Sequence, residues 1–205
     1  MRADISSNRL SWFYRLDYRK LILAAFLLRF IAACTYDIFV SVTDRDILFP
    51  DSKFYSTIGR YITLLLNRYD KEPYFNNIML DDKVSRAIFI DTLERNEGHL
   101  PKIYGPNAYW FYIIGYIYFI FGYFPLGVRV FNIFLSIAST YFLFKIAKRH
   151  FGELTANLFL LIALFLPTQF GYSITFSKDF VRMFIISFAL WLLYGGVICI
   201  KRQGL

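Results

Sequence analysis

Residues 21–42 read LILAAFLLRFIAACTYDIFVSV, and this apolar block decides the fold class. It is apolar on all sides of a helix rather than along one stripe, and it is long enough to cross a bilayer, which takes about 20 residues. Comparable blocks follow at residues 126–145, 154–172 and 180–200. Because an outer-membrane barrel would instead show alternating strands of about ten residues, the pattern predicts an all-α integral membrane protein.

The composition of the whole chain agrees with this fold class. Apolar residues make up 57% of the sequence, whereas a soluble domain usually has less than about half. The formal net charge of +8 could indicate nucleic-acid binding, but the basic residues stand at the ends of apolar blocks, as in cytoplasmic loops. Cys34 and Cys199 lie within apolar segments and do not resemble a structural disulfide. No zinc-binding spacing, P-loop or dinucleotide fingerprint is present in the sequence.

We expect a single membrane domain over residues 1–205. Residues 1–20 are basic and would form a cytoplasmic tail, followed by the first span at residues 21–42. Residues 43–125 would form an extracytoplasmic loop, and residues 126–200 three further spans. Both termini are then cytoplasmic, in a bacterial inner membrane or, for a eukaryotic chain, in the ER membrane.

The long first loop is predicted to carry two further helices. In residues 51–66, apolar side chains recur at helical spacing with polar ones between them, which is typical of an amphipathic helix on a membrane surface. Residues 106–122 are apolar and rich in tyrosine, but at about 1.5 Å per residue they barely reach across a bilayer. If they lie at the interface, the basic clusters at 145–150 and 201–202 fall on the cytoplasmic side. This favours four spans plus two surface helices over the alternative of five spans.

Two acidic residues near the outer membrane surface could carry chemistry. Asp51 follows the first span and Asp179 precedes the last, so the four-span topology puts both on one side. Two carboxylates there could supply a general base and an orienting or metal-binding partner, or each could only cap a helix. The cations near them are Arg60, Lys178 and Arg182. These groups could hold a phosphate.

One cation, Arg29, lies inside the first span, where the bilayer penalises charge. Charges at such depth usually pair with another group or line a functional cavity. Arg29 is therefore either a functional group or a structural partner of Asp37, which stands about two turns further along the same helix.

The order of these features resembles the N-terminal part of the GT-C-fold glycosyltransferases. That family includes protein O-mannosyltransferases, lipid A aminoarabinose transferases and oligosaccharyltransferase catalytic subunits. In it a D-x-x-x-Y motif follows the first span; Asp51 to Tyr55 fits this motif, and Arg60 fits the related pattern that ends in arginine. The other correspondences are Tyr104-Gly105-Pro106-Asn107-Ala108-Tyr109, Phe121–Gly122, Arg129, Lys148-Arg149-His150-Phe151-Gly152 and Asp179.

The resemblance implies an enzyme that moves a sugar from a polyprenyl-phosphate-linked donor to an acceptor hydroxyl on the extracytoplasmic side. Asp51 would be the general base, and Asp179 a second catalytic carboxylate or a ligand of a divalent metal cofactor. The residues implied to contact substrate or phosphate are Tyr55, Arg60, Lys102, Tyr104, Lys178 and Arg182. Tyr104 replaces a lysine or histidine that is frequent in the family, and Lys102 could take over its role.

Members of this family are longer and contain later spans, so the sequence is interpreted as an N-terminal portion. The expected partners are the donor lipid, membrane lipid, and either a further membrane subunit or additional C-terminal spans, with no nucleic acid. Two other function classes stay open: a non-catalytic membrane module that binds a polyprenyl lipid or a partner subunit, and a transporter or flippase. The transporter ranks last because such proteins often contain internal repeats, and none is evident in the sequence.

Cysteine accessibility can test the four-span topology. Leu100→Cys and His150→Cys, each made alone in a variant whose native cysteines are serine, should be labelled from opposite sides of the membrane. The charge distribution predicts residues 43–104 outside and residues 145–152 inside. The measurement is labelling by a membrane-impermeant maleimide before and after permeabilisation. Labelling of both positions from the same side would contradict the topology.

Overall fold

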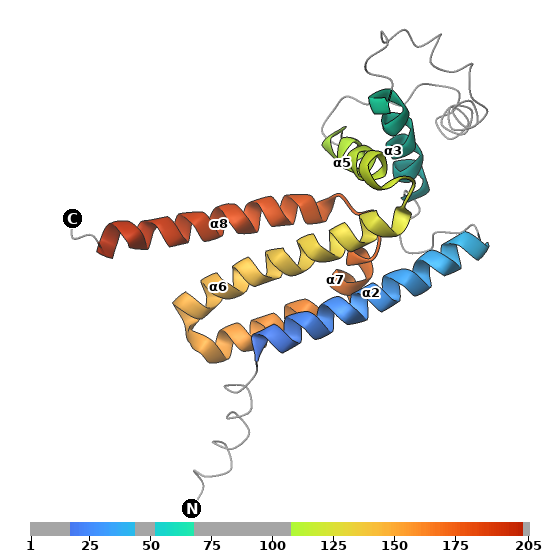
Figure 1. The fold of residues 1–205 in the computed structure, drawn as a ribbon. Helices are drawn as coiled ribbons and strands as arrows, with labels where there is room; N and C mark the ends of the chain where they lie inside the picture. Colours follow the sequence, from blue (N-terminus) through green and yellow to red (C-terminus); the bar gives the residue numbers. More distant parts are fainter. Residues whose placement is uncertain (1–16, 44–51, 68–107, 203–205) are drawn as a thin grey trace, which may run out of the picture. The chain divides into compact units, whose positions relative to one another are not determined.

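A computed structural model describes residues 17–43, 52–67 and 108–202 (Figure 1). In chain order its helices are α2 (Tyr18–Thr43), α3 (Ser52–Asn67), α5 (Ala108–Phe121), α6 (Pro125–Phe165), α7 (Pro167–Ser173) and α8 (Asp179–Arg202). The described residues contain no strand, which confirms the all-helical prediction for this part of the chain.

Two of the described helices, α2 and α6, are long and apolar enough to cross a membrane. The helix α5 is apolar but has only 14 residues. On α2 the side chains of Leu23, Leu28 and Ile31 are half exposed or more. Such exposure is unfavourable in water and natural in lipid. The number of spans, four or five, stays a prediction.

The described chain divides into two compact units, residues 1–35 with 130–205 and residues 36–129, and each unit is described by itself. The first is called the larger unit and the second the smaller unit below.

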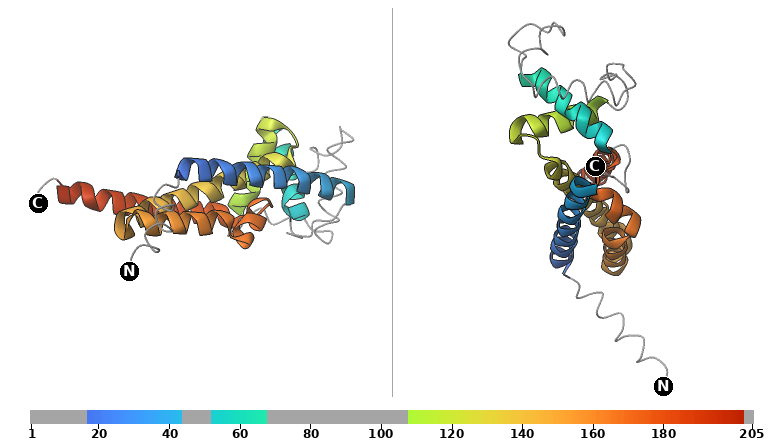
Figure 2. Two further views of the ribbon diagram at one scale, coloured as in Figure 1. Left: turned by 90° about the horizontal axis from the view of Figure 1, so that it is seen from below. Right: turned by 90° about the vertical axis from the view of Figure 1, so that its right-hand side faces the viewer.

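In the larger unit, the first part of α2 lies alongside α6 (Figures 1 and 2). The rings of Tyr18 on α2 and Phe144 on α6 have centroids 5.4 Å apart. Ala25, Arg29 and Ala33 recur every four residues of α2, and all three are buried. Two of these three side chains are small, which lets helices approach closely in a membrane protein.

The helix α6 reverses its direction at Gly152, where φ is 85° and ψ is 174° (Figure 1). A positive φ of this kind is accessible to glycine without steric cost. The two helices predicted from the apolar blocks at 126–145 and 154–172 are therefore joined through a very short turn. On either side of Gly152, Lys148 Nζ lies 2.6 Å from Glu153 Oε1.

The prediction of one continuous helix over residues 154–172 is wrong. The helix α6 ends at Phe165, and α7 begins at Pro167. Leu166 between them has φ −59° and ψ 123°. This is the extended conformation that a following proline favours, because the proline ring clashes with a helical backbone at the preceding residue.

The smaller unit is built on the crossing of α3 and α5 at two glycines. A Cβ atom on Gly59 would lie 2.3 Å from Cγ2 of Ile114, and a Cβ atom on Gly115 would lie 2.5 Å from Cγ2 of Ile62. Across the interface, Thr63 Oγ1 donates a hydrogen bond to the carbonyl oxygen of Gly115 at 3.0 Å. The two helices therefore approach each other closely because neither glycine has a side chain, as in other small-residue helix pairs.

A buried pair of hydroxyl groups adds specificity to this crossing. Ser56 Oγ on α3 and Tyr118 Oη on α5 are 2.9 Å apart, and both side chains are buried. Burial raises the pKa of the Tyr118 phenol above its usual value, so the group stays protonated. Each hydroxyl satisfies the other in a place where an unpaired polar group would be costly.

We expect Gly59→Ala to destabilise the α3–α5 pair. The added methyl group would meet Ile114, which is fully buried and β-branched and so has little rotamer freedom. Overpacking of this kind costs about 1–3 kcal/mol, and a contact this short should exceed the gain of about 1 kcal/mol from the helix propensity of alanine. The measurement is the midpoint of thermal unfolding in detergent.

Gly171→Ala is the matched control, because a Cβ atom there meets no atom within 4 Å. It should leave the midpoint unchanged or raise it. The double variant Gly59→Ala/Ile114→Ala should lose less stability than the two single variants lose together, because the truncated Ile114 makes room for the new methyl group. An unchanged midpoint for Gly59→Ala would show that the helices do not depend on this close approach.

Candidate functional site

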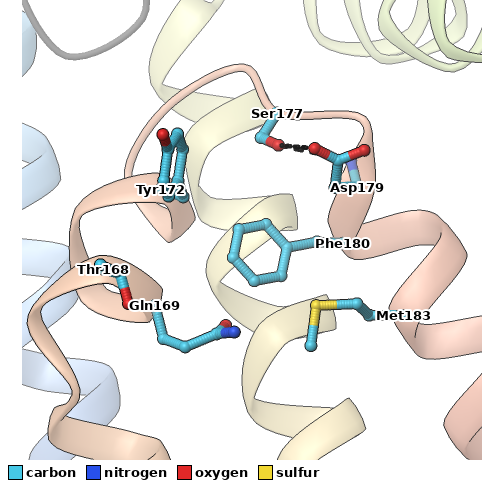
Figure 3. A pocket seen from close by; sticks show the side chains of 7 residues that line it. All are labelled: Thr168, Gln169, Tyr172, Ser177, Asp179, Phe180 and Met183. Atoms are coloured by element: carbon cyan, nitrogen blue, oxygen red, sulfur yellow. Dashed lines mark hydrogen bonds between the residues drawn. The ribbon is translucent and has the colours of Figure 1, made fainter.

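A pocket lies beside the turn that joins α7 to α8 in the larger unit (Figure 3). Its volume is about 250 Å³, and it is lined by Thr168, Gln169, Tyr172, Ser177, Asp179, Phe180 and Met183. The lining combines hydroxyl, amide and carboxylate groups with aromatic and thioether surface. This mixture of apolar surface with a few polar groups is typical of small-molecule sites.

Asp179 contributes an exposed carboxylate to this pocket and is the first residue of α8. Ser177 Oγ accepts a hydrogen bond from the Asp179 amide at 3.3 Å and donates one to Asp179 Oδ2 at 3.4 Å (Figure 3). Within the described residues, the carboxylate accepts no hydrogen bond from an amide of its own helix. Ser177 therefore takes the capping role at this helix start, and the Asp179 side chain remains available to a ligand.

Two cations accompany Asp179. Arg182 stands one turn along α8, and its Nη1 atom lies 3.8 Å from Asp179 Oδ1. Lys178 directly precedes Asp179 and is half-buried. The sequence prediction of an acidic residue with neighbouring cations at this turn thus has a structural counterpart, and such a group can bind a phosphate or a metal-bound anion.

Asn132 of α6 holds the backbone of this turn. Its Nδ2 atom donates hydrogen bonds to the carbonyl oxygens of Thr175 at 2.6 Å and Ser177 at 3.0 Å. All three residues are buried, so water cannot replace the asparagine. Sequence reasoning missed this residue, although an asparagine within an apolar span is a recognisable sign of an interhelical hydrogen bond.

Arg29 makes two hydrogen bonds to α6 in the larger unit. Its Nη1 atom lies 2.8 Å from Ser136 Oγ, and its Nη2 atom lies 2.7 Å from the carbonyl oxygen of Leu164. Leu164 belongs to the last turn of α6, where carbonyl groups lack intrahelical partners. The guanidinium group therefore completes a helix end and complements its partial negative charge.

Of the two alternatives for Arg29, the pairing with Asp37 is wrong. Asp37 Oδ1 instead accepts a hydrogen bond from Arg129 Nε at 3.1 Å within the smaller unit. Arg129 also lies over the ring of Tyr36, 5.1 Å from its centroid. Eight residues separate Arg29 from Asp37, which is about 12 Å along a helix axis, so each group finds a nearer partner on α6.

Two further predicted site residues, Tyr55 and Arg60, lie on α3 in the smaller unit. The ring of Tyr55 is buried against Phe111 of α5, with centroids 5.6 Å apart. The Arg60 guanidinium lies over the Tyr123 ring, 4.6 Å from its centroid. Tyr55 thus contributes to packing, and Arg60 remains partly accessible.

The remaining predicted site residues lie outside the described residues; they are Asp51, Lys102 and Tyr104. The convergence of Asp51 with Asp179 therefore stays a prediction. In the described ranges no three His, Cys, Asp or Glu side chains gather as metal ligands would. Metal binding by Asp51 together with Asp179 also stays a prediction, because one of its two ligands is not described.

Comparison with known proteins gives a family match, and the matched residues include all those that line this pocket. Residues 106–204 match the family model of the dolichyl-phosphate-mannose-protein mannosyltransferases. The match includes the whole of α5, α6, α7 and α8 and so contains Asn132 and Asp179. It supports a GT-C-like glycosyltransferase fragment and confirms the resemblance found in the sequence. No curated protein and no solved structure matches the chain.

Within this mannosyltransferase-like segment, we expect Asn132→Ala to loosen the turn that carries Asp179. The change leaves two buried carbonyl groups without a donor, and each such group costs about 1–3 kcal/mol. The measurement is amide hydrogen exchange of residues 173–181 in detergent, which should become faster by at least about tenfold for a loss of 1.4 kcal/mol.

Ser139→Ala is the control on the same helix. Its buried hydroxyl donates only to the carbonyl oxygen of Leu135 in the preceding turn of α6, so its loss should leave exchange in the turn unchanged. Equal exchange rates in Asn132→Ala and the wild type would refute the positioning role of the asparagine.

Proposed function

We propose that the chain is a membrane glycosyltransferase, or the N-terminal portion of one, that moves a sugar from a polyprenyl-phosphate-linked donor to an acceptor hydroxyl on the extracytoplasmic side. The observation that carries the proposal is the match of residues 106–204 to the mannosyltransferase family model. The apolar helices α2 and α6 support a membrane location. A donor with a long lipid tail requires an enzyme in that location.

In this proposal Asp51 is the general base. It takes the proton of the acceptor hydroxyl while the anomeric carbon of the sugar loses its polyprenyl phosphate. The acceptor oxygen attacks from the face opposite to the leaving phosphate, so the anomeric configuration inverts. The proton goes to the Asp51 carboxylate, and the bond from the anomeric carbon to the phosphate oxygen breaks with its electrons remaining on the phosphate.

The pocket at Asp179 would bind part of the substrate. Arg182 and Lys178 supply positive charge that can offset the negative charge of the leaving phosphate. Asp179, at 3.8 Å from Arg182 Nη1, can orient that guanidinium group or bind a divalent metal. Tyr172 and Phe180 offer apolar surface beside these charged groups, which suits the apolar face of a sugar ring.

Asp51→Asn tests the assignment of the base. Asparagine keeps the size and the helix-capping ability of aspartate but cannot accept the proton. Transfer should fall by about two orders of magnitude or more, within the usual range for a general base, while the protein still folds. The measurement is transfer of labelled sugar from a polyprenyl-phosphate donor in membranes that contain the full natural protein.

Asp46→Asn is the matched control, because Asp46 lies in the same loop but outside the D-x-x-x-Y motif. It should retain transfer. Unchanged transfer by Asp51→Asn would defeat the catalytic assignment. A wild-type protein that binds the donor lipid without any transfer would favour the non-catalytic membrane module instead.

A further inference from the structure

Five described cations stand at the end of the larger unit that is remote from the Asp179 pocket; they are Arg19, Lys20, Lys145, Lys148 and Arg149. Along α6, Lys145 comes thirteen residues after Asn132, which is about 20 Å. Arg149 follows one turn later, and Arg19 and Lys20 lie in the first turn of α2. The proposed glycosyl transfer uses none of these residues.

Two of these cations lie near the same aromatic ring, that of Tyr18. The Arg19 guanidinium carbon lies 5.8 Å from the Tyr18 ring centroid, and Lys145 Nζ lies 5.7 Å from the same centroid. Lys145 Nζ is also 5.2 Å from the ring centroid of Tyr141. The contact between α2 and α6 therefore holds two positive charges around Tyr18.

The described acidic groups nearby form no ion pair with Arg19 or Lys145. The Asp17 carboxylate accepts a hydrogen bond from the backbone amide of Arg19 at 3.0 Å and so caps α2. Glu153 pairs with Lys148 instead. Among the described residues, neither Arg19 nor Lys145 has a carboxylate within ion-pair distance. Their positive charge, which no described carboxylate neutralises in an ion pair, favours the binding of an anion.

An exposed apolar stripe follows Arg19 along α2. Leu23, Leu27 and Ile31 follow it at intervals of four residues, which puts all four on one face of α2. The exposed fractions of the three apolar side chains are 59%, 48% and 61%. The distance along the helix axis is about 18 Å from Arg19 to Ile31 and about 12 Å for the apolar stripe itself, from Leu23 to Ile31. These lengths are comparable to one leaflet of a hydrocarbon core of about 30 Å. A charged group at the head of a stripe of this length matches a phospholipid and not a soluble phosphate.

We propose that Arg19, Lys145 and Tyr18 bind the phosphate of an anionic glycerophospholipid, whose acyl chain lies along the stripe formed by Leu23, Leu27 and Ile31. The guanidinium and ammonium groups form charge-assisted hydrogen bonds to the phosphate oxygens. Aromatic residues at this level suit the headgroup region of a membrane. The site is independent of the proposed glycosyl transfer.

Native mass spectrometry of the full chain in detergent tests the site. Phosphatidylglycerol should bind more tightly than phosphatidylcholine. The double variant Arg19→Gln/Lys145→Gln should lower the affinity for phosphatidylglycerol about tenfold or more, which is the usual contribution of two cations at a membrane surface. Affinity for phosphatidylcholine should not change. Equal phosphatidylglycerol affinity in the double variant and the wild type would overturn the proposal.

Matched variants distinguish an effect of the lost charges from an effect on the folded structure. Lys148→Gln removes a cation one turn away that Glu153 already neutralises, so phosphatidylglycerol affinity should be retained. Arg19→Lys/Lys145→Arg keeps both charges and should retain most of the binding. If the double glutamine variant does not fold, the single change Lys145→Gln serves in its place, and a wild-type affinity would count against the site.

A soluble probe separates the lipid from a free anion. Glycerol 3-phosphate carries the same phosphate chemistry without acyl chains and should not displace phosphatidylglycerol. Leu27→Asn, which interrupts the stripe, should weaken phosphatidylglycerol binding although both cations remain. Displacement by glycerol 3-phosphate at concentrations similar to those of the lipid would show a soluble-anion site and overturn the lipid proposal.

Discussion

Polar side chains on apolar helices must find partners inside the protein, because lipid offers none and an unpaired buried group costs about 1–3 kcal/mol. On α6 this constraint acts on Arg129, Asn132 and Ser136. Within the smaller unit Arg129 binds Asp37. Within the larger unit Asn132 binds the α7–α8 turn, and Ser136 binds Arg29 of α2. The turn that carries the candidate site is therefore held by one of these polar residues, Asn132.

The helices could be predicted from the sequence because each corresponds to an apolar or amphipathic block. The contacts between the helices could not be predicted. Arg29 shows the reason: its distance from Asp37 along the helix is too long for an ion pair, but its actual acceptors lie more than a hundred residues away in the chain. The crossing of Gly59 with Gly115 is equally non-local. The interruption at Leu166 is different, since Pro167 signalled it in the sequence.

In the candidate site, too, neighbours on one helix could be predicted from the sequence, whereas contacts between helices could not. Asp179 and Arg182 lie three residues apart at the start of a helix, so sequence spacing alone predicts that they are neighbours. Tyr55 was predicted to bind substrate, and its burial depends on Phe111 of α5, which no local pattern reveals. The pocket beside Asp179 also needs α7, which exists as a separate helix because of Pro167.

The reversal at Gly152 bears on how the chain is made. Its two helical halves are joined without the loop of several residues that usually connects neighbouring helices. If both halves cross the bilayer, as the sequence predicts, so short a turn would require them to leave the translocon together as a helical hairpin. A side chain at position 152, where φ is 85°, would strain this turn and so oppose the formation of the hairpin before any tertiary contact of the finished protein has formed.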